Sequence, residues 1–369
     1  HLLIRQSHGR TNEVGFHSRR RIIASVRKKK TTRRTTSWTR WPDDRLLDTR
    51  LCDLRLTLSG GLVLAALREL EHELAARSIL FRPHWWLSDC WFCPDGVPGF
   101  AIPFYLAHPR LAKLEQQFML EAEGGTAESC LKILRHETAH ALANAYRLHL
   151  KQVWRRRFGR ASRVYPESYL PRPGSRNYVI HLDNWYAQSH PAEDWAETFA
   201  VWLDPHSRWR ERYHNWPALK KLEYVDALMQ EIRGGKPPVR TRRQIDAVSS
   251  LTLTLREYFE QKQARLRADY PRFHEEQLRQ IFPGPRHGKR ERASRLVRRL
   301  KRELLTTVAA WTSDSRYRIH LTLEDMASRC DELDLVAGND PQQNRVALVA
   351  ALVMLYMGSL RSGAARLAV

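Results

Sequence analysis

The chain has 369 residues, of which 43% are hydrophobic and 28% are charged. This balance is that of a globular protein and excludes a disordered or fibrous chain. At about 150 residues per domain, the length predicts two domains and a tail. The longest apolar stretch, residues 346–357, is shorter than the roughly 20 residues that a bilayer crossing requires. We therefore expect a buried helix there and no membrane insertion.

The net charge of +22 is concentrated in two segments. Residues 1–42 carry twelve Lys and Arg against one acid, and residues 286–303 carry nine against two. The first segment is predicted to be a basic disordered tail and the second a basic helix. Such segments attract phosphate backbones through a salt-sensitive, non-specific interaction, so nucleic acid is one expected partner. A solvated helix face is the alternative for the second segment.

The five cysteines, at positions 52, 90, 93, 130 and 330, are too scattered for a disulfide framework. Cys90 and Cys93 form a lone CxxC without the second pair that a zinc ribbon requires, so we interpret them as structural or incidental thiols. A reducing compartment is expected, and the predicted location is cytoplasmic.

Apolar residues at helical spacing predict an amphipathic helix over residues 61–77. Residues 78–82 and 97–106 are rich in β-branched and aromatic residues, which is typical of short strands in a small mixed sheet. Within the second of these, residues 99–105 are the candidate edge that would align a substrate backbone by strand addition.

Two further helices are predicted, one from Thr126 as its N-cap to about residue 150 and one from Pro191 to Asp204. Residues 153–176 between them are predicted to form a long loop.

Glycine, proline and arginine punctuate residues 234–245, which we interpret as a linker. This boundary gives a main domain over residues 43–233 and a helical C-terminal domain over residues 246–369. The predicted fold class is α+β and predominantly helical.

Residues 136–140 read His-Glu-Thr-Ala-His, an HExxH pattern, on the first of the two long helices. Positions four apart on an α-helix differ by about 40° in azimuth, so His136 and His140 project from one face and can bind one cation. Glu137 beside them is the candidate general base. Ala143 and Tyr146 stand where the metzincin pattern requires glycine and histidine, which excludes that class.

A catalytic zinc ion normally has three protein ligands and one open position, so a third ligand is needed. Glu193, on the helix that begins at Pro191, is the predicted third ligand. Glu197 lies one turn later and can accept a hydrogen bond from the non-liganding nitrogen of a histidine, which fixes the orientation of the ring. The rival third ligands are His181, Asp183, His190 and Asp194.

These segments carry a resemblance to a known family. The residues concerned are HETAHA at 136–141, PAEDWAETFAVWL at 191–203, IPFYLAHPRL at 102–111 and WPALKKLEYVDALM at 216–229. Over residues 80–232 the chain resembles the bacterial zinc-binding metallopeptidases called Peptidase Mx, and the 191–203 element is also similar to the second metal-binding helix of gluzincins. The resemblance implies a zincin-like catalytic domain, with Glu193 as ligand, Glu197 as its support and Tyr186 as the residue that stabilises the oxyanion.

The expected activity is that of a gluzincin-type metallopeptidase with Zn²⁺ as cofactor. Zinc would lower the pKa of its water, and Glu137 would take the proton and pass it to the leaving nitrogen. The candidate substrate-binding residues are Arg155, Arg156, Arg157 and Tyr165. Because guanidinium groups bind carboxylates, an acidic peptide is the expected substrate.

Two other readings remain open from the sequence. In the first, the basic segments bind nucleic acid and the chain is a DNA-dependent protease or a binding protein. In the second, a degenerate zincin serves as a scaffold, although a scaffold need not retain Glu137 beside both histidines.

Overall fold

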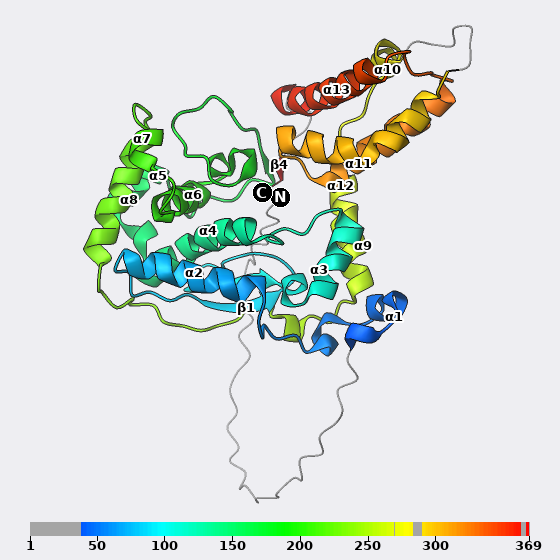
Figure 1. The fold of residues 1–369 in the computed structure, drawn as a ribbon. Coiled ribbons are helices and arrows are strands. Elements are labelled where there is room, and N and C mark those ends of the chain that lie inside the picture. The colour runs from blue at the N-terminus through cyan, green and yellow to red at the C-terminus, as the bar shows by residue number, and fades with distance from the viewer. Residues whose placement is uncertain (1–37, 269, 283–289, 363–366, 369) are drawn as a thin grey trace, which may run out of the picture.

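The computed structural model describes residues 38–268, 270–282, 290–362 and 367–368 (Figure 1). Helices make up 60% of the structure and strands 5%, so the predominantly helical fold is confirmed. The predicted basic tail lies outside the described residues up to residue 37, and residues 283–289 of the second basic segment also lie outside them.

The α-helices of the described part are α1 Asp43–Leu47, α2 Leu62–Ala76, α3 Pro109–Met119, α4 Ala127–Tyr146, α5 Gln152–Phe158, α6 Pro191–Leu203, α7 Trp209–Arg212, α8 Leu219–Ile232, α9 Leu255–Arg267, α10 Glu275–Ile281, α11 Ala293–Thr312, α12 Arg316–Glu332 and α13 Pro341–Ser362. The strands are β1 His84–Ser88, β2 Gly99–Pro103, β3 Ser168–Tyr169 and β4 Leu367–Ala368, and β3 pairs antiparallel with β4. A 3₁₀ segment, η5, spans Asp183–Gln188.

Local sequence signals fix the starts of the two helices that matter most. Thr126 caps α4 by accepting the backbone N–H of Ser129, and the Ser129 side chain accepts the N–H of Thr126 in return. His190 caps α6 by accepting the N–H of Ala192, and Pro191 follows at the first helical position, where no N–H is needed. Both helices therefore begin where the sequence predicts.

Helix α4 is the centre of the larger part of the molecule, because it packs against α2 on one side and α6 on another (Figure 1). A buried ion pair between Arg135 on α4 and Glu73 on α2 joins the first pair of helices. The Trp195 indole N–H on α6 donates to the carbonyl of Ala139 at 2.9 Å and joins the second pair. Helix α8 contacts α6 in turn, so the helices α2, α4, α6 and α8 follow one another across this region.

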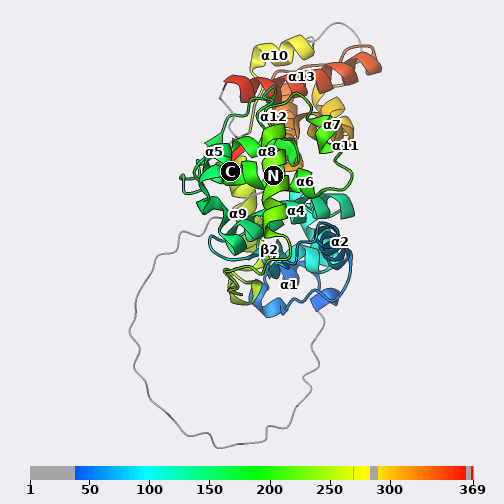
Figure 2. The same cartoon turned by 90° about the vertical axis from the view of Figure 1, so that its left-hand side faces the viewer.

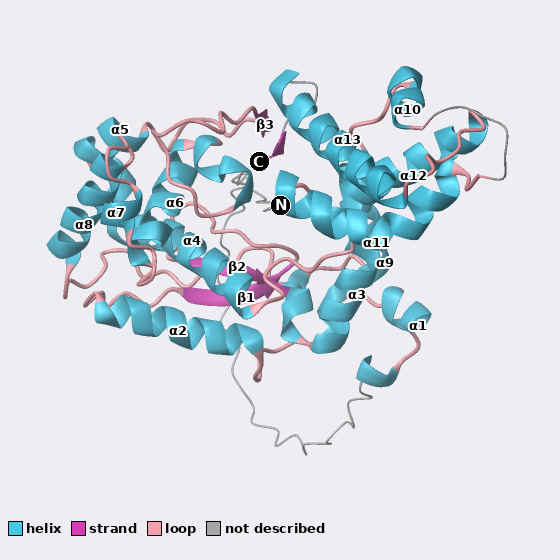
Figure 3. Cartoon of the chain, turned by 45° about the horizontal axis from the view of Figure 1, so that its top comes forward, coloured by secondary structure: helices cyan, strands magenta, loops and turns pink. Residues whose placement is uncertain are grey.

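The small sheet differs from the prediction. Strands β1 and β2 lie side by side and are parallel, with Trp86 opposite Ala101 (Figure 3). The strand predicted over residues 78–82 is wrong, because Ser78 has a left-handed φ of 56° and the strand begins only at His84. On the other edge of β2, the Ala101 N–H donates to the carbonyl of Phe92 at 2.8 Å. The expected substrate-aligning edge over residues 99–105 is thus occupied at Ala101.

The segment predicted as a linker, residues 234–245, runs along β1. Side chains of His84, Trp86 and Ser88 donate hydrogen bonds of 2.9, 2.8 and 2.6 Å to the carbonyl groups of residues 243, 245 and 246. Alternate side chains of β1 therefore bind this segment, which packs against the main domain as an ordered extended segment.

The C-terminal helices form a second apolar cluster, which begins at Phe273. Helix α9 precedes it and packs into the first apolar cluster through Leu255, Tyr258 and Phe259. The boundary between the two clusters therefore lies after α9, later in the chain than the predicted domain boundary. In Figure 2, α10 and α13 lie at one end of the molecule and α1 at the other.

Helix α13 contains the apolar stretch of residues 346–357, but it is not buried on all sides. Leu348, Leu352 and Tyr356 are buried, whereas Val346 and Met354 are exposed. The helix that was expected to be buried is therefore buried on one face and exposed on the other. Among the helices of the described residues, none combines the length and apolar character that a bilayer crossing needs.

Candidate metal centre

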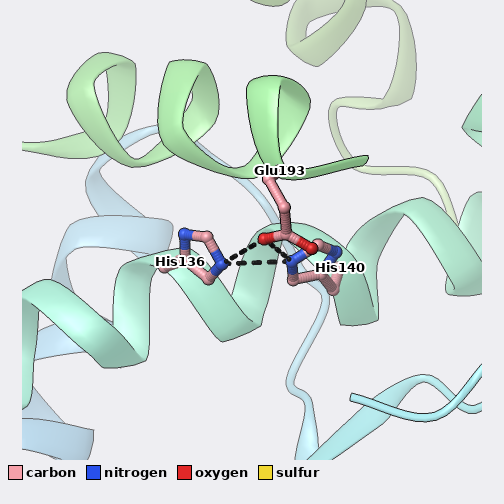
Figure 4. Close-up of side chains that lie close together, drawn as sticks. All are labelled: His136, His140 and Glu193. Carbon is pink, nitrogen blue, oxygen red and sulfur yellow. Dashed lines mark hydrogen bonds and ion pairs between the residues drawn. The ribbon is translucent and has the colours of Figure 1, made fainter. Parts of the chain in front are cut away.

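Three side chains from two helices meet at one point (Figure 4). His136 and His140 project from α4 toward α6, and Glu193 in the first turn of α6 projects toward them. Glu193 Oε2 lies 3.0 Å from His136 Nε2 and 3.1 Å from His140 Nε2, and the two imidazole nitrogens are 3.1 Å apart. The three atoms form a nearly equilateral triangle.

This triangle fits a divalent metal ion. Tetrahedral coordination with bonds of about 2.0–2.1 Å places zinc ligand atoms about 3.3 Å apart, close to the observed spacing, and two histidines with one glutamate are a recurrent catalytic zinc set. Burial lowers the pKa of His136, but the Glu193 and Glu197 carboxylates outweigh burial and raise it to about 10. The surroundings of His136 thus favour positive charge at this point.

Glu197 supports the first histidine from behind. The His136 Nδ1–H donates to Glu197 Oε1 at 2.8 Å, and the backbone N–H of Leu182 donates to Glu197 Oε2 at 2.8 Å. In the neutral form that binds a metal ion, the imidazole would keep its proton on Nδ1 and direct the Nε2 lone pair toward His140 and Glu193. The structure therefore places Glu197 where the predicted support requires it.

Glu137 is completely buried beside the two histidines. Neither of its carboxylate oxygens has a hydrogen-bond partner among the described residues. Burial raises the pKa of Glu137 to about 7, although His136 and His140 lower it in part. A buried carboxylate without partners destabilises the fold, so its presence here calls for a functional explanation.

A cavity of about 380 Å³ opens onto this group and includes Glu137, His140 and Glu193 in its walls. Tyr165 lines the same cavity, and its hydroxyl donates to Glu193 Oε1 at 2.6 Å. The Tyr165 ring stacks on His190 at 3.6 Å between centroids. The hydroxyl of Tyr165 is therefore held at the carboxylate of the candidate metal-binding group.

Tyr186, which the resemblance implies as the oxyanion donor, occupies a different place. Its ring lies 5.8 Å from that of His136, and its hydroxyl is buried without a hydrogen-bond partner among the described residues. Burial raises the pKa of Tyr186 well above its usual value. The cavity lining includes Tyr165 but not Tyr186, so Tyr165 is the one of these two tyrosines that faces the cavity.

The rival third ligands have other contacts. Asp194 accepts an ion-pair hydrogen bond of 2.6 Å from Lys221, and His181 donates to the carbonyl of Lys132 at 3.0 Å. His190 is the α6 cap, and Asp183 lines a separate cavity of about 680 Å³. Of the five candidates, Glu193 is the one that the fold brings to the imidazole pair.

The predicted substrate-binding arginines are placed elsewhere. Arg155, Arg156 and Arg157 lie on α5, where a loop was expected, and they are exposed. None of the three lines the cavity, whereas Arg163 from the following loop does. Arg163 belongs to the same arginine-rich segment from which a substrate-binding role was predicted. Sequence analysis missed Asp95 as a cavity residue, because it belongs to no motif and only the fold brings its segment to α4.

No protein-family model, curated protein or solved structure matches this chain. The resemblance to Peptidase Mx therefore stays a prediction.

Proposed function

We propose that the chain is a metallopeptidase that hydrolyses peptide bonds with a zinc ion held by His136, His140 and Glu193. One observation carries the proposal: three ligand atoms converge within 3.1 Å of one another, and the unpartnered carboxylate of Glu137 lies beside them. Acid–base catalysis next to a metal needs this combination. Five free thiols accord with a reducing, cytoplasmic location.

When bound, zinc would polarise the scissile carbonyl as a Lewis acid and lower the pKa of a water molecule. Glu137 takes a proton from the attacking water and then delivers it to the leaving amine, and its raised pKa of about 7 suits both transfers. The hydroxyl of Tyr165 turns from Glu193 to the oxyanion that forms on the substrate carbonyl. Glu197 keeps the His136 ring in place throughout.

The structure gives the nucleic-acid alternative no specific support. In the described part of the second basic segment, several cations are already paired with acids, namely Arg298 with Asp331, Arg299 with Glu291 and Lys301 with Glu324. These pairs reduce the charge that α11 offers to a phosphate backbone.

The test combines metal analysis with a peptide-cleavage assay. The purified chain is expected to contain about one zinc ion and to lose cleavage when treated with a chelator. Glu137→Gln should retain the zinc and reduce kcat by about 10²–10⁴-fold, because the general base is removed. Glu128→Gln, an exposed change on the same helix, is the matched control. Full activity of the Glu137→Gln variant, or a purified chain that binds no metal, would overturn the proposal.

A further inference from the structure

His190, at the start of α6, uses both nitrogens of its ring. The side chain is buried, with 3% of its surface exposed. Its Nδ1 accepts the backbone N–H of Ala192 at 3.2 Å, so this nitrogen carries no proton. The Nε2–H therefore donates to the backbone carbonyl of Arg163 at 2.9 Å. The neutral ring caps its own helix and also binds the loop that follows α5.

The face of the same ring contacts a second residue of that loop. Tyr165 stacks on His190 with the ring centroids 3.6 Å apart and the planes 21° apart. The Tyr165 hydroxyl donates to Glu193 Oε1 at 2.6 Å, and Glu193 lies in the first turn of α6, three residues after His190. One end of one helix therefore holds both the ring of Tyr165 and the acceptor of its hydroxyl.

The loop also begins against the same end of α6. Gly159, the residue after α5, has a φ of 108°, and a Cβ at this position would lie 3.1 Å from Pro191 Cγ. Glycine suits both the left-handed conformation and the close approach. Beyond it, Arg160, Arg163 and Val164 are exposed. Little of this stretch is buried, so its contacts with the start of α6 fix its course.

Helix α3 begins with the same pair of residues and allows a comparison. His108 Nδ1 accepts the N–H of Arg110 at 3.1 Å, and Pro109 follows as the first helical residue. The ring of His108 meets that of Trp38 edge to edge or edge to face, at 4.9 Å and 73°. Both histidines are helix caps, whereas the stack on a tyrosine of the cavity wall belongs to His190.

We propose that His190 is a positioning residue, which holds Tyr165 so that its hydroxyl stays at the candidate metal-binding group and can donate to the oxyanion of the substrate. The proposal rests on the proposed function, since it assigns the group that orients the donor. The stack fixes the plane of the ring, while the hydroxyl hydrogen can rotate about its C–O bond from Glu193 toward another acceptor. His190, a rival third ligand from the sequence, thus acts through Tyr165.

The first experiment replaces His190 with a residue that keeps the cap. Asparagine retains an acceptor for the N–H of Ala192, but it has no ring and ends before the position of Nε2. His190→Asn should therefore lower kcat by on the order of 10-fold through the loss of one stack and one hydrogen bond. KM should change little, because an oxyanion donor acts in the transition state. His108→Asn is the matched control and should leave kcat unchanged.

The second experiment separates positioning from a structural role. In the Tyr165→Phe background, His190→Asn should lower kcat by less than about twofold, because the hydroxyl that His190 positions is already absent. A structural role would lower kcat by the same factor in both backgrounds, and that result would overturn the proposal.

Limited digestion of the zinc-loaded chain with trypsin tests the loop without any assay of activity. Arg160 and Arg163 are exposed, so cleavage after them reports how firmly the loop is held. His190→Asn should accelerate cleavage at these two sites by on the order of 10-fold, as followed by mass spectrometry. If His190→Asn does not fold, His190→Phe, which keeps the ring but not the Nε2–H, should accelerate cleavage at the same sites.

The two proposals fail in different ways. If the zinc-loaded chain cleaves no peptide, the proposed function fails, and the digestion still tests whether His190 holds the loop. If peptides are cleaved but His190→Asn leaves kcat unchanged, or leaves the digestion unchanged, the positioning role is overturned and the peptidase function stands.

Discussion

The contact between α4 and α6 and the contact between α11 and α12 are two extensive helix pairs with opposite interiors. Aliphatic side chains dominate the second interface, including Leu304 and Leu323. The first buries one histidine and three glutamates, namely His136, Glu137, Glu193 and Glu197, and partly buries His140. Burying charged groups destabilises a fold unless they are paired or bind a metal, whereas burying leucine stabilises it. Apolar packing explains most of the interior between α11 and α12, where the buried Arg318 pairs with Asp314. The carboxylate of Glu137 on α4, which has no hydrogen-bond partner in the described part of the chain, calls for a function.

The largest expected effect tests a buried charge that lies away from the metal centre. Glu115 is buried, and Lys262 donates to it at 2.5 Å. Lys262→Met leaves this carboxylate without its cation and should lower the free energy of unfolding by about 3–5 kcal/mol at neutral pH, as measured in urea.

The pH dependence of the Lys262→Met variant follows from the same carboxylate. Burial already raises the pKa of Glu115 above its usual value, and loss of the lysine raises it further. The protonated form is then favoured in the folded state. The loss of unfolding free energy in the variant should therefore become smaller as the pH falls toward this pKa and larger again as the pH rises. A loss of unfolding free energy that becomes larger at lower pH would contradict this interpretation.

The apolar interface is tested by a cavity-forming change. Leu304→Ala on α11 should lower the free energy of unfolding by about 2–5 kcal/mol, because its side chain is completely buried in the second cluster. Zinc content and kcat are expected to stay at the wild-type level, which an assay below the unfolding transition checks. A loss of zinc in the folded variant would show that the two regions are not separable.

The two tyrosines near the site are compared by matched removal of one oxygen atom. Tyr165→Phe should reduce kcat by about 10²–10³-fold, the effect of removing one oxyanion donor. Tyr186→Phe should change kcat little, because that hydroxyl does not face the cavity. If only the Tyr186 variant loses activity, the oxyanion donor is the one that the resemblance implies.

The smallest expected effect concerns the residue behind His136. Glu197→Gln should weaken zinc affinity about 10–100-fold, since the ring keeps a hydrogen-bond partner but loses the carboxylate. Competition with a chelator measures the affinity, and Glu223→Gln on α8 is an exposed control. Unchanged affinity would mean that Glu197 has no role in holding the ring.

The sequence by itself determined the features that depend on short spacing. Residues four apart share a helix face, so His136 and His140 could be paired, and cap residues before α4 and α6 marked where each helix begins. The same logic placed Glu193 one turn before Glu197 on one face of α6.

Only the tertiary structure decided which residues surround His136, His140 and Glu193. Strand β1, the occupied edge of β2 and the helical placement of Arg155 depend on contacts between distant segments, which local spacing does not encode. The choice of Tyr165 over Tyr186 depends on how the loop after α5 folds over α6. Periodicity fixes the direction of a side chain on its own helix, but the partner across a cavity is set by long-range packing.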